Sequence, residues 1–159
     1  MLLPAFEWLS GLEVSQALAA ASLLTPLIQA LHLVALAVFM GAVLVVDLRL
    51  LGQGLTAQPV SRVAQGARPW FAGSLATLVA TGVPQLMSLA EKEYHSEWFW
   101  MKMYFLAAAL LFTVTVRAWL TRERGDGAGA EPGWAKAAAI VSIVLWSGVA
   151  VSARLIGLL

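Results

Sequence analysis

Four long apolar stretches constrain this chain more than any other feature of its sequence. They run roughly over residues 24–46, 70–90, 98–120 and 134–155. Each has the roughly 20 residues that a helix needs to cross a bilayer, where every backbone polar group must be bonded inside the protein. Only 12% of the residues are charged, which excludes an ordinary soluble domain. We therefore expect an all-α integral membrane protein, with residues 1–159 forming one up-down-up-down four-helix bundle.

The first 22 residues and the distribution of charge predict how the chain sits in the membrane. Residues 1–22 carry Trp8 and two glutamates, which is typical of an amphipathic helix on the membrane surface. Basic residues, among them Arg62 and Arg122, gather after the first and third spans, whereas the link AEKEYHSEW between the second and third is acidic. By the positive-inside rule, both basic loops lie in the cytoplasm and both termini lie outside.

Several classes of function are excluded or disfavoured by composition. The net charge of +1 argues against nucleic acid as a partner. The absence of cysteine excludes disulfides, thiolate metal sites and covalently attached c-type haem. No phosphate loop, zinc-protease helix or nucleophile elbow is present. An electron carrier or an accessory subunit is therefore favoured over a stand-alone enzyme.

Polar side chains form a stripe on each of the first two spans. Thr25, Gln29, His32 and Asp47 fall on one face of the first at helical spacing, and Ser74, Thr77, Thr81, Gln85 and Ser88 fall on one face of the second. Because polar groups are costly in lipid, we expect these faces to meet in the interior. For the hydroxyls the favoured interpretation is helix-to-helix hydrogen bonding without further function.

His32 is the strongest candidate for function, because ionisable residues inside a span are rare. Neutral imidazole is a common axial ligand of haem, and helix bundles hold such cofactors between their helices. We expect a b-type haem on His32, with Gln29, Thr81 and Lys102 as further cofactor-binding residues. Lys102 would meet an anionic group such as a haem propionate, or else reach the headgroups or Glu97.

The second histidine leaves the ligand set open. His95 lies in the acidic link, so a shared iron would require this link to dip inward; otherwise His32 acts alone or with a partner from a neighbouring subunit. A copper site is the alternative, with His32 and His95 as metal ligands together with Met101 and Met103, since imidazole and thioether suit Cu(I).

Three stretches resemble a known but uncharacterised family. They are LHLVALAVFMGAVLVVDLRLLG, ARPWFAGSLATLVATG and WFWMKMYFLAAALL. Together they resemble a bacterial four-helix inner-membrane family classed as a domain of unknown function. The matching positions are His32, the Asp-Leu-Arg-Leu-Leu-Gly exit at 47–52, Pro69, Thr81, Gly82 and Lys102. Looser similarity extends to CopD-type copper-resistance membrane domains and small membrane b-type cytochromes. Glu97 and Trp98 stand where the family usually has Asn-Pro, and His95 matches no family hallmark.

These observations lead to three functional hypotheses. The first is a haem-b-binding, redox-linked protein of the bacterial inner membrane that moves electrons between a membrane quinone and an extracytoplasmic protein. The second is a copper-handling membrane protein. The third is a cofactor-free accessory or assembly subunit. The expected partners are the lipid bilayer and either further copies of the chain or a larger membrane complex.

Overall fold

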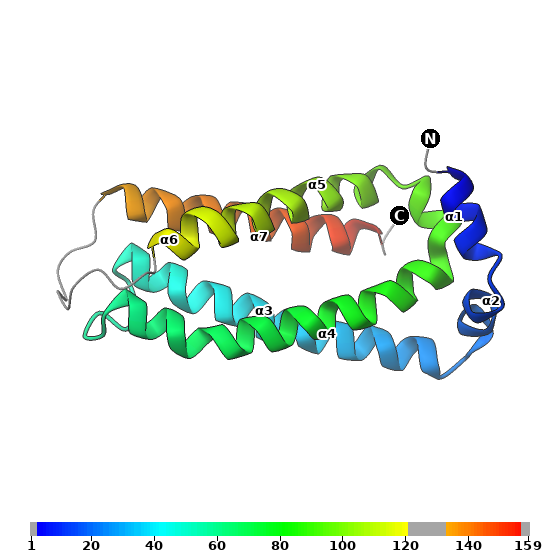
Figure 1. The fold of residues 1–159 in the computed structure, drawn as a ribbon, viewed down its shortest axis with the longest axis horizontal. Coiled ribbons are helices and arrows are strands. Elements are labelled where there is room, and N and C mark those ends of the chain that lie inside the picture. The colour runs from blue at the N-terminus through cyan, green and yellow to red at the C-terminus, as the bar shows by residue number, and fades with distance from the viewer. Residues whose placement is uncertain (1–2, 121–132, 157–159) are drawn as a thin grey trace.

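The structure is a computed structural model that describes residues 3–120 and 133–156, and this part of the chain is helical without any strand (Figure 1). The helices are α1 (Leu3–Ser10), α2 (Glu13–Ala20), α3 (Leu24–Leu51), α4 (Val60–Tyr94), α5 (Glu97–Phe112), the π-helix η1 (Thr113–Arg117), α6 (Ala118–Leu120) and α7 (Gly133–Ile156). Four segments are long and apolar enough to span a membrane: Leu24–Leu51, Val60–Ala90, Glu97–Val116 and Gly133–Ile156. The prediction of an all-α, multi-pass membrane protein is confirmed. Most of the third loop, with Arg122 and Arg124, lies outside the described residues.

The observed helices differ from the predicted segments in two places. The second span was expected from residue 70, but α4 already begins at Val60, directly after Pro59. Proline suits a helix start, because its missing N–H would lack an intrahelical partner there anyway. Residues 1–22 were expected to form one surface helix, whereas α1 and α2 are separate. Their break lies at Gly11 and Leu12, where Leu12 has an extended backbone.

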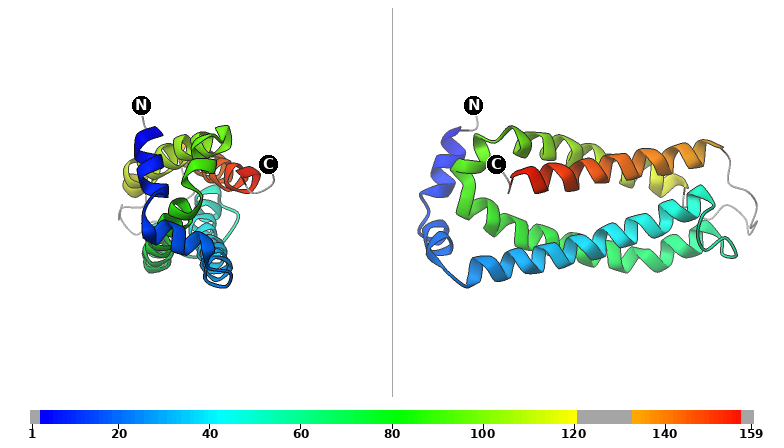
Figure 2. Two further views of the ribbon diagram at one scale, coloured as in Figure 1. Left: turned by 90° about the vertical axis from the view of Figure 1, so that its right-hand side faces the viewer. Right: turned by 180° about the vertical axis from the view of Figure 1, so that it is seen from behind.

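The long helices form two antiparallel pairs, α3 with α4 and α5 with α7 (Figures 1 and 2). Gly52 ends α3 in a left-handed conformation that glycine adopts without a Cβ penalty. At the opposite end of the pair, α4 bends at Leu89, where φ is −130° and ψ is 20°. The bend carries the last turns of α4 towards α5, and α1 and α2 lie across this end of the molecule (Figure 1).

Two groups of buried apolar side chains connect the pairs. Near the α3–α4 loop, the buried residues are Val46, Leu50, Val60, Val63, Ala67, Ala135 and Ala139. Nearer the middle, Phe39 of α3 stacks edge-on against Trp146 of α7 at 4.5 Å between ring centroids. The Trp146 indole N–H donates to the Thr113 hydroxyl of η1 over 3.3 Å. These contacts hold the pairs together on the side away from α1.

Aromatic contacts and a side-chain hydrogen bond hold α1 and α2 against the end of the molecule where α4 meets α5. Phe6 of α1 packs against Tyr94, Phe99 and Trp100, with 5.2 Å between the Phe6 and Tyr94 centroids. The Thr25 hydroxyl donates to the Leu18 carbonyl and so ties α2 to the start of α3. Residues 3–20 therefore cover the end of the molecule where α4 meets α5.

Candidate functional site

His32 on α3 is bound to α4 by a single polar contact. Its Nδ1 lies 2.7 Å from the Thr81 hydroxyl oxygen. Thr81 is buried and the imidazole is half-buried. The next residue, Gly82, lets the ring lie close to the α4 backbone, because a Cβ at that position would be 3.4 Å from the imidazole Cε1. The Thr81-Gly82 pair thus supplies both the hydrogen bond and the space for the ring.

The hydrogen bonds around Thr81 favour one tautomer of His32. The Thr81 hydroxyl donates its one proton to the Thr77 carbonyl oxygen over 2.7 Å. It is therefore assigned as the acceptor towards His32, and the imidazole carries its proton on Nδ1. The other nitrogen, Nε2, keeps its lone pair and makes no hydrogen bond to the described residues. An imidazole held in this way can accept a proton, a hydrogen bond or a metal ion at Nε2.

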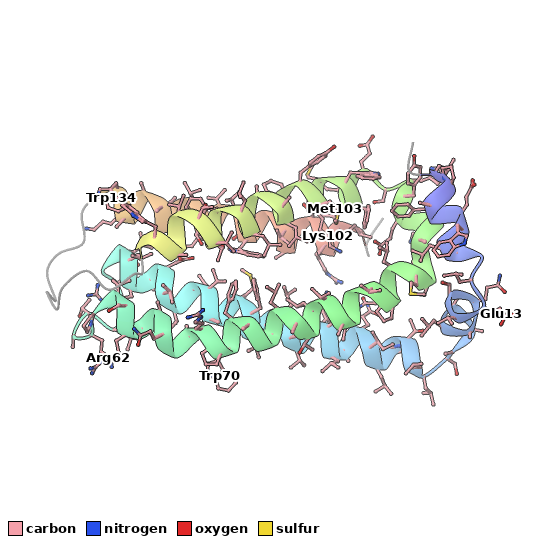
Figure 3. All side chains as sticks on the ribbon, in the orientation of Figure 1. Glu13, Arg62, Trp70, Lys102, Met103 and Trp134 are labelled. Carbon is pink, nitrogen blue, oxygen red and sulfur yellow. The ribbon has the colours of Figure 1, made fainter. Side chains whose placement is uncertain are left out.

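Lys102 on α5 brings a positive charge to the same region. Its side chain extends from α5 towards the α3–α4 pair (Figure 3). The ammonium is close enough to act electrostatically on both His32 and Glu93. It also lies 6.0 Å from the centre of the Phe99 ring. Of the predicted roles for Lys102, a position facing the interior fits better than a side chain extended to the headgroups or paired with Glu97.

Glu93 completes this group of charges and was not expected from the sequence. It lies beyond the spanning part of α4, and burial raises the pKa of its carboxyl above the ordinary 4.5, against the opposing effect of Lys102. The folded protein therefore binds more protons than the unfolded chain between the two pKa values. Its stability falls as the pH rises through this interval.

We predict that Glu93→Gln flattens this pH dependence. Wild-type protein should be most stable below pH 4.5 with respect to this one group, and should lose that contribution as Glu93 ionises. The neutral amide cannot ionise, so the variant should lose less stability between about pH 4 and about pH 8. Thermal unfolding in detergent measures the difference, with the exposed Glu97→Gln as the matched control. Parallel curves for wild type and Glu93→Gln would contradict the assignment.

The other predicted site residues are not brought to His32. Gln29 is exposed, although its place in the stripe predicted an interior position. His95 caps the end of α4 and is exposed, and the helix between Thr81 and His95 covers about 20 Å at 1.5 Å per residue. The two histidines therefore do not share an iron within one chain. Met101 and Met103 are exposed on α5, and the described residues contain no group of three or more His, Cys, Asp or Glu that could hold a metal ion.

Most side chains of the polar stripe on α4 form hydrogen bonds within α4 itself. The side chains of Ser74, Thr77, Gln85 and Ser88 all bond to backbone carbonyl oxygens three or four residues earlier. Such local bonds satisfy hydroxyls and amides without a partner helix. Thr81 differs, because its oxygen also meets His32 of α3. The expectation that the stripe joins helices thus holds at one position.

Another interhelical polar contact lies towards the other end of α3. The Ser142 hydroxyl of α7 donates to Asp47 Oδ2 over 2.7 Å, and both residues are fully buried. Arg49, two residues further along α3, donates its Nε–H to the Gln58 carbonyl oxygen. Ser142 was missed because a serine in an apolar helix carries no sign of which neighbour it faces.

Comparison with known proteins identifies the family of the chain but does not indicate an activity. Residues 14–159 match the model of the family of unknown function DUF6644. No curated protein and no solved structure matches the chain. The likeness to CopD-type domains and b-type cytochromes is not supported by these comparisons and stays a hypothesis.

Proposed function

The chain belongs to DUF6644, a family of unknown function, and from its His32 site we propose a redox-linked membrane protein that binds a b-type haem. One observation carries the proposal: the Thr81 hydroxyl oxygen lies 2.7 Å from Nδ1 of the imidazole and also bonds to the Thr77 carbonyl oxygen, an arrangement that assigns the proton to Nδ1 and the free lone pair to Nε2. Ligating histidines commonly donate their second ring N–H to a neighbouring acceptor, which sets the tautomer and orients the ring. Within a membrane span, such an arrangement favours a ligand over simple helix packing.

The residues around His32 fit a haem better than they fit a closed metal site. A haem iron needs only axial ligands from the protein, because the porphyrin supplies the other four nitrogens. His32 would be one axial ligand. Lys102 extends towards the same interior and would pair with a carboxylate of the cofactor. A copper site needs several protein ligands, whereas His95 is remote from His32 and Met101 and Met103 are exposed on α5.

The bound group would supply one-electron exchange, and the chain's own residues would supply position and charge. Thr81 orients the imidazole, and Gly82 leaves room for the ring against α4. Lys102 would offset the negative charge of the cofactor's carboxylates. We propose a membrane quinone and an extracytoplasmic protein as the electron-transfer partners, since the site lies in the half of the molecule covered by α1 and α2.

The same proposal includes an orientation in the bacterial inner membrane. Arg49, Arg62 and Arg68 lie on the last turn of α3 and the first turns of α4, at the end opposite to α1. By the positive-inside rule, this end faces the cytoplasm. Both termini, and with them the His32 half, then face outward.

Absorption spectroscopy of the purified protein tests the proposal. Wild-type protein, isolated from membranes in mild detergent, should show a Soret band with about one haem per chain or per pair of chains. His32→Ala should lose the band, whereas His95→Ala should keep it, because His95 is exposed and remote from Thr81. A wild-type preparation without a Soret band, in protein that is folded by circular dichroism, overturns the haem proposal and favours the cofactor-free accessory subunit.

A further inference from the structure

A groove opens between α3 and α4 on the opposite half of the molecule from His32. Its volume is about 400 Å³. It is lined by Val38, Gly41, Ala42 and Val45 of α3, Leu55 and Gln58 of the loop, and Arg62, Val63, Gly66, Ala67 and Trp70 of α4. Most of these side chains are apolar or small, and the two strongly polar ones, Gln58 and Arg62, lie at or beside the loop. The groove is thus apolar along the spans and polar at one end.

The length and width of the groove indicate the kind of molecule that it admits. From Val38 to Val45 it follows α3 for about 10 Å at 1.5 Å per residue. A single extended hydrocarbon chain is thinner than a helix, which is about 10 Å across with its side chains. An acyl chain therefore fits along the groove, whereas a helix of a second copy could insert only the side chains of one face.

Charge at the loop end indicates the head of that molecule. Arg62 is exposed in the first turn of α4, near the α3–α4 loop (Figure 3). This first turn has no acidic residue, and Arg62 has no ion pair with any described residue. The start of a helix is itself electropositive, so the helix does not compensate the positive charge of an arginine at that position. An anion held at Arg62 would supply the missing negative charge.

We propose that this groove binds one anionic phospholipid. Its acyl chain lies between Gly41 and Gly66, and its phosphate is held by Arg62. Basic residues between spanning helices attract anionic headgroups in this way. Trp70 projects from α4 on the side away from α5 and α7 (Figure 3) and forms the far rim of the groove. The proposal is independent of any cofactor on His32.

Two glycines allow a direct test. A Cβ at Gly41 or Gly66 would meet nothing within 4 Å, and both positions line the groove, so a leucine side chain there has room to extend into it. Gly73 of α4 is equally open but does not line the groove, which makes Gly73→Leu the matched control. Native mass spectrometry of the detergent-purified protein, titrated with phosphatidylglycerol or with phosphatidylethanolamine, measures each variant.

Wild-type protein should retain one phosphatidylglycerol in preference to phosphatidylethanolamine. Gly66→Leu and Gly41→Leu should each weaken phosphatidylglycerol binding by about tenfold or more, and Gly73→Leu should not. Arg62→Gln should weaken it about fivefold, whereas Arg68→Gln, at an exposed arginine outside the groove, should have a smaller effect. Equal lipid binding by Gly66→Leu and Gly73→Leu, or loss of a dimer instead of a lipid in Gly66→Leu, overturns the proposal.

Discussion

Thr81→Val is expected to weaken haem binding about 10- to 100-fold, the usual effect of removing a hydrogen-bond partner from a ligating histidine. Valine keeps the shape of threonine but cannot accept the Nδ1–H of His32, whose distance to the hydroxyl is 2.7 Å. The imidazole is then free to rotate and to change tautomer. Haem titration of the cofactor-depleted protein, followed by the Soret band, measures the change.

Two companion variants separate this effect from a general disturbance of α4. Thr77→Val removes a hydroxyl one turn earlier that bonds only to the Gly73 carbonyl oxygen, so haem affinity should stay close to that of wild type. Thr81→Ser retains a hydroxyl and should restore most of the affinity. If Thr77→Val and Thr81→Val lose the same affinity, Thr81 has no particular role in orienting His32.

Asp47→Ala should clearly lower the stability of the folded protein. Asp47 is completely buried and accepts the Ser142 hydroxyl over 2.7 Å, so alanine leaves that buried hydroxyl without this acceptor and opens a space between α3 and α7. We expect a loss of about 1.5–3 kcal/mol. Unfolding in a detergent–denaturant series measures it, with circular dichroism as the probe.

Asp47→Asn is the matched control for that experiment. The asparagine side chain retains an oxygen that can accept from Ser142 at nearly the same volume. Asp47→Asn should therefore lower the free energy of unfolding clearly less than Asp47→Ala does. A double-mutant cycle with Ser142→Ala isolates the pair, and a coupling free energy near zero would show that the contact does not stabilise the fold.

The helical architecture could be predicted because lipid restricts the choice of structure. Length and hydropathy alone placed the fourth span at residues 134–155, where α7 runs from Gly133 to Ile156. The start of α4 was missed because hydropathy reports the lipid-embedded part only. Val60 to Arg68 are helical but contain two arginines and Gln65, and Pro69 follows directly. This mixture is also typical of a loop.

The sequence predicted the two central residues of the candidate site but not which residues surround them. His32 and Thr81 were both singled out, since polar residues at helical spacing in a span are readily seen. Their mutual contact depends on the relative rotation and register of α3 and α4, which the local sequence around either residue, 49 positions apart, does not determine. For the same reason Gln29 was placed in the interior although it is exposed, and the partial burial of Glu93 was not foreseen.

Nitrogen-15 NMR of the histidine-labelled, cofactor-free protein in lipid nanodiscs tests the central claim most directly. Only two histidines are present, so His95→Ala assigns the His32 signals. At about pH 8, above the ordinary titration range of histidine, His32 should show a protonated Nδ1 and an unprotonated Nε2, and Thr81→Val should abolish this preference. A proton found on Nε2 instead would mean that Thr81 donates to the ring, and His32 would then have no lone pair to offer to a ligand.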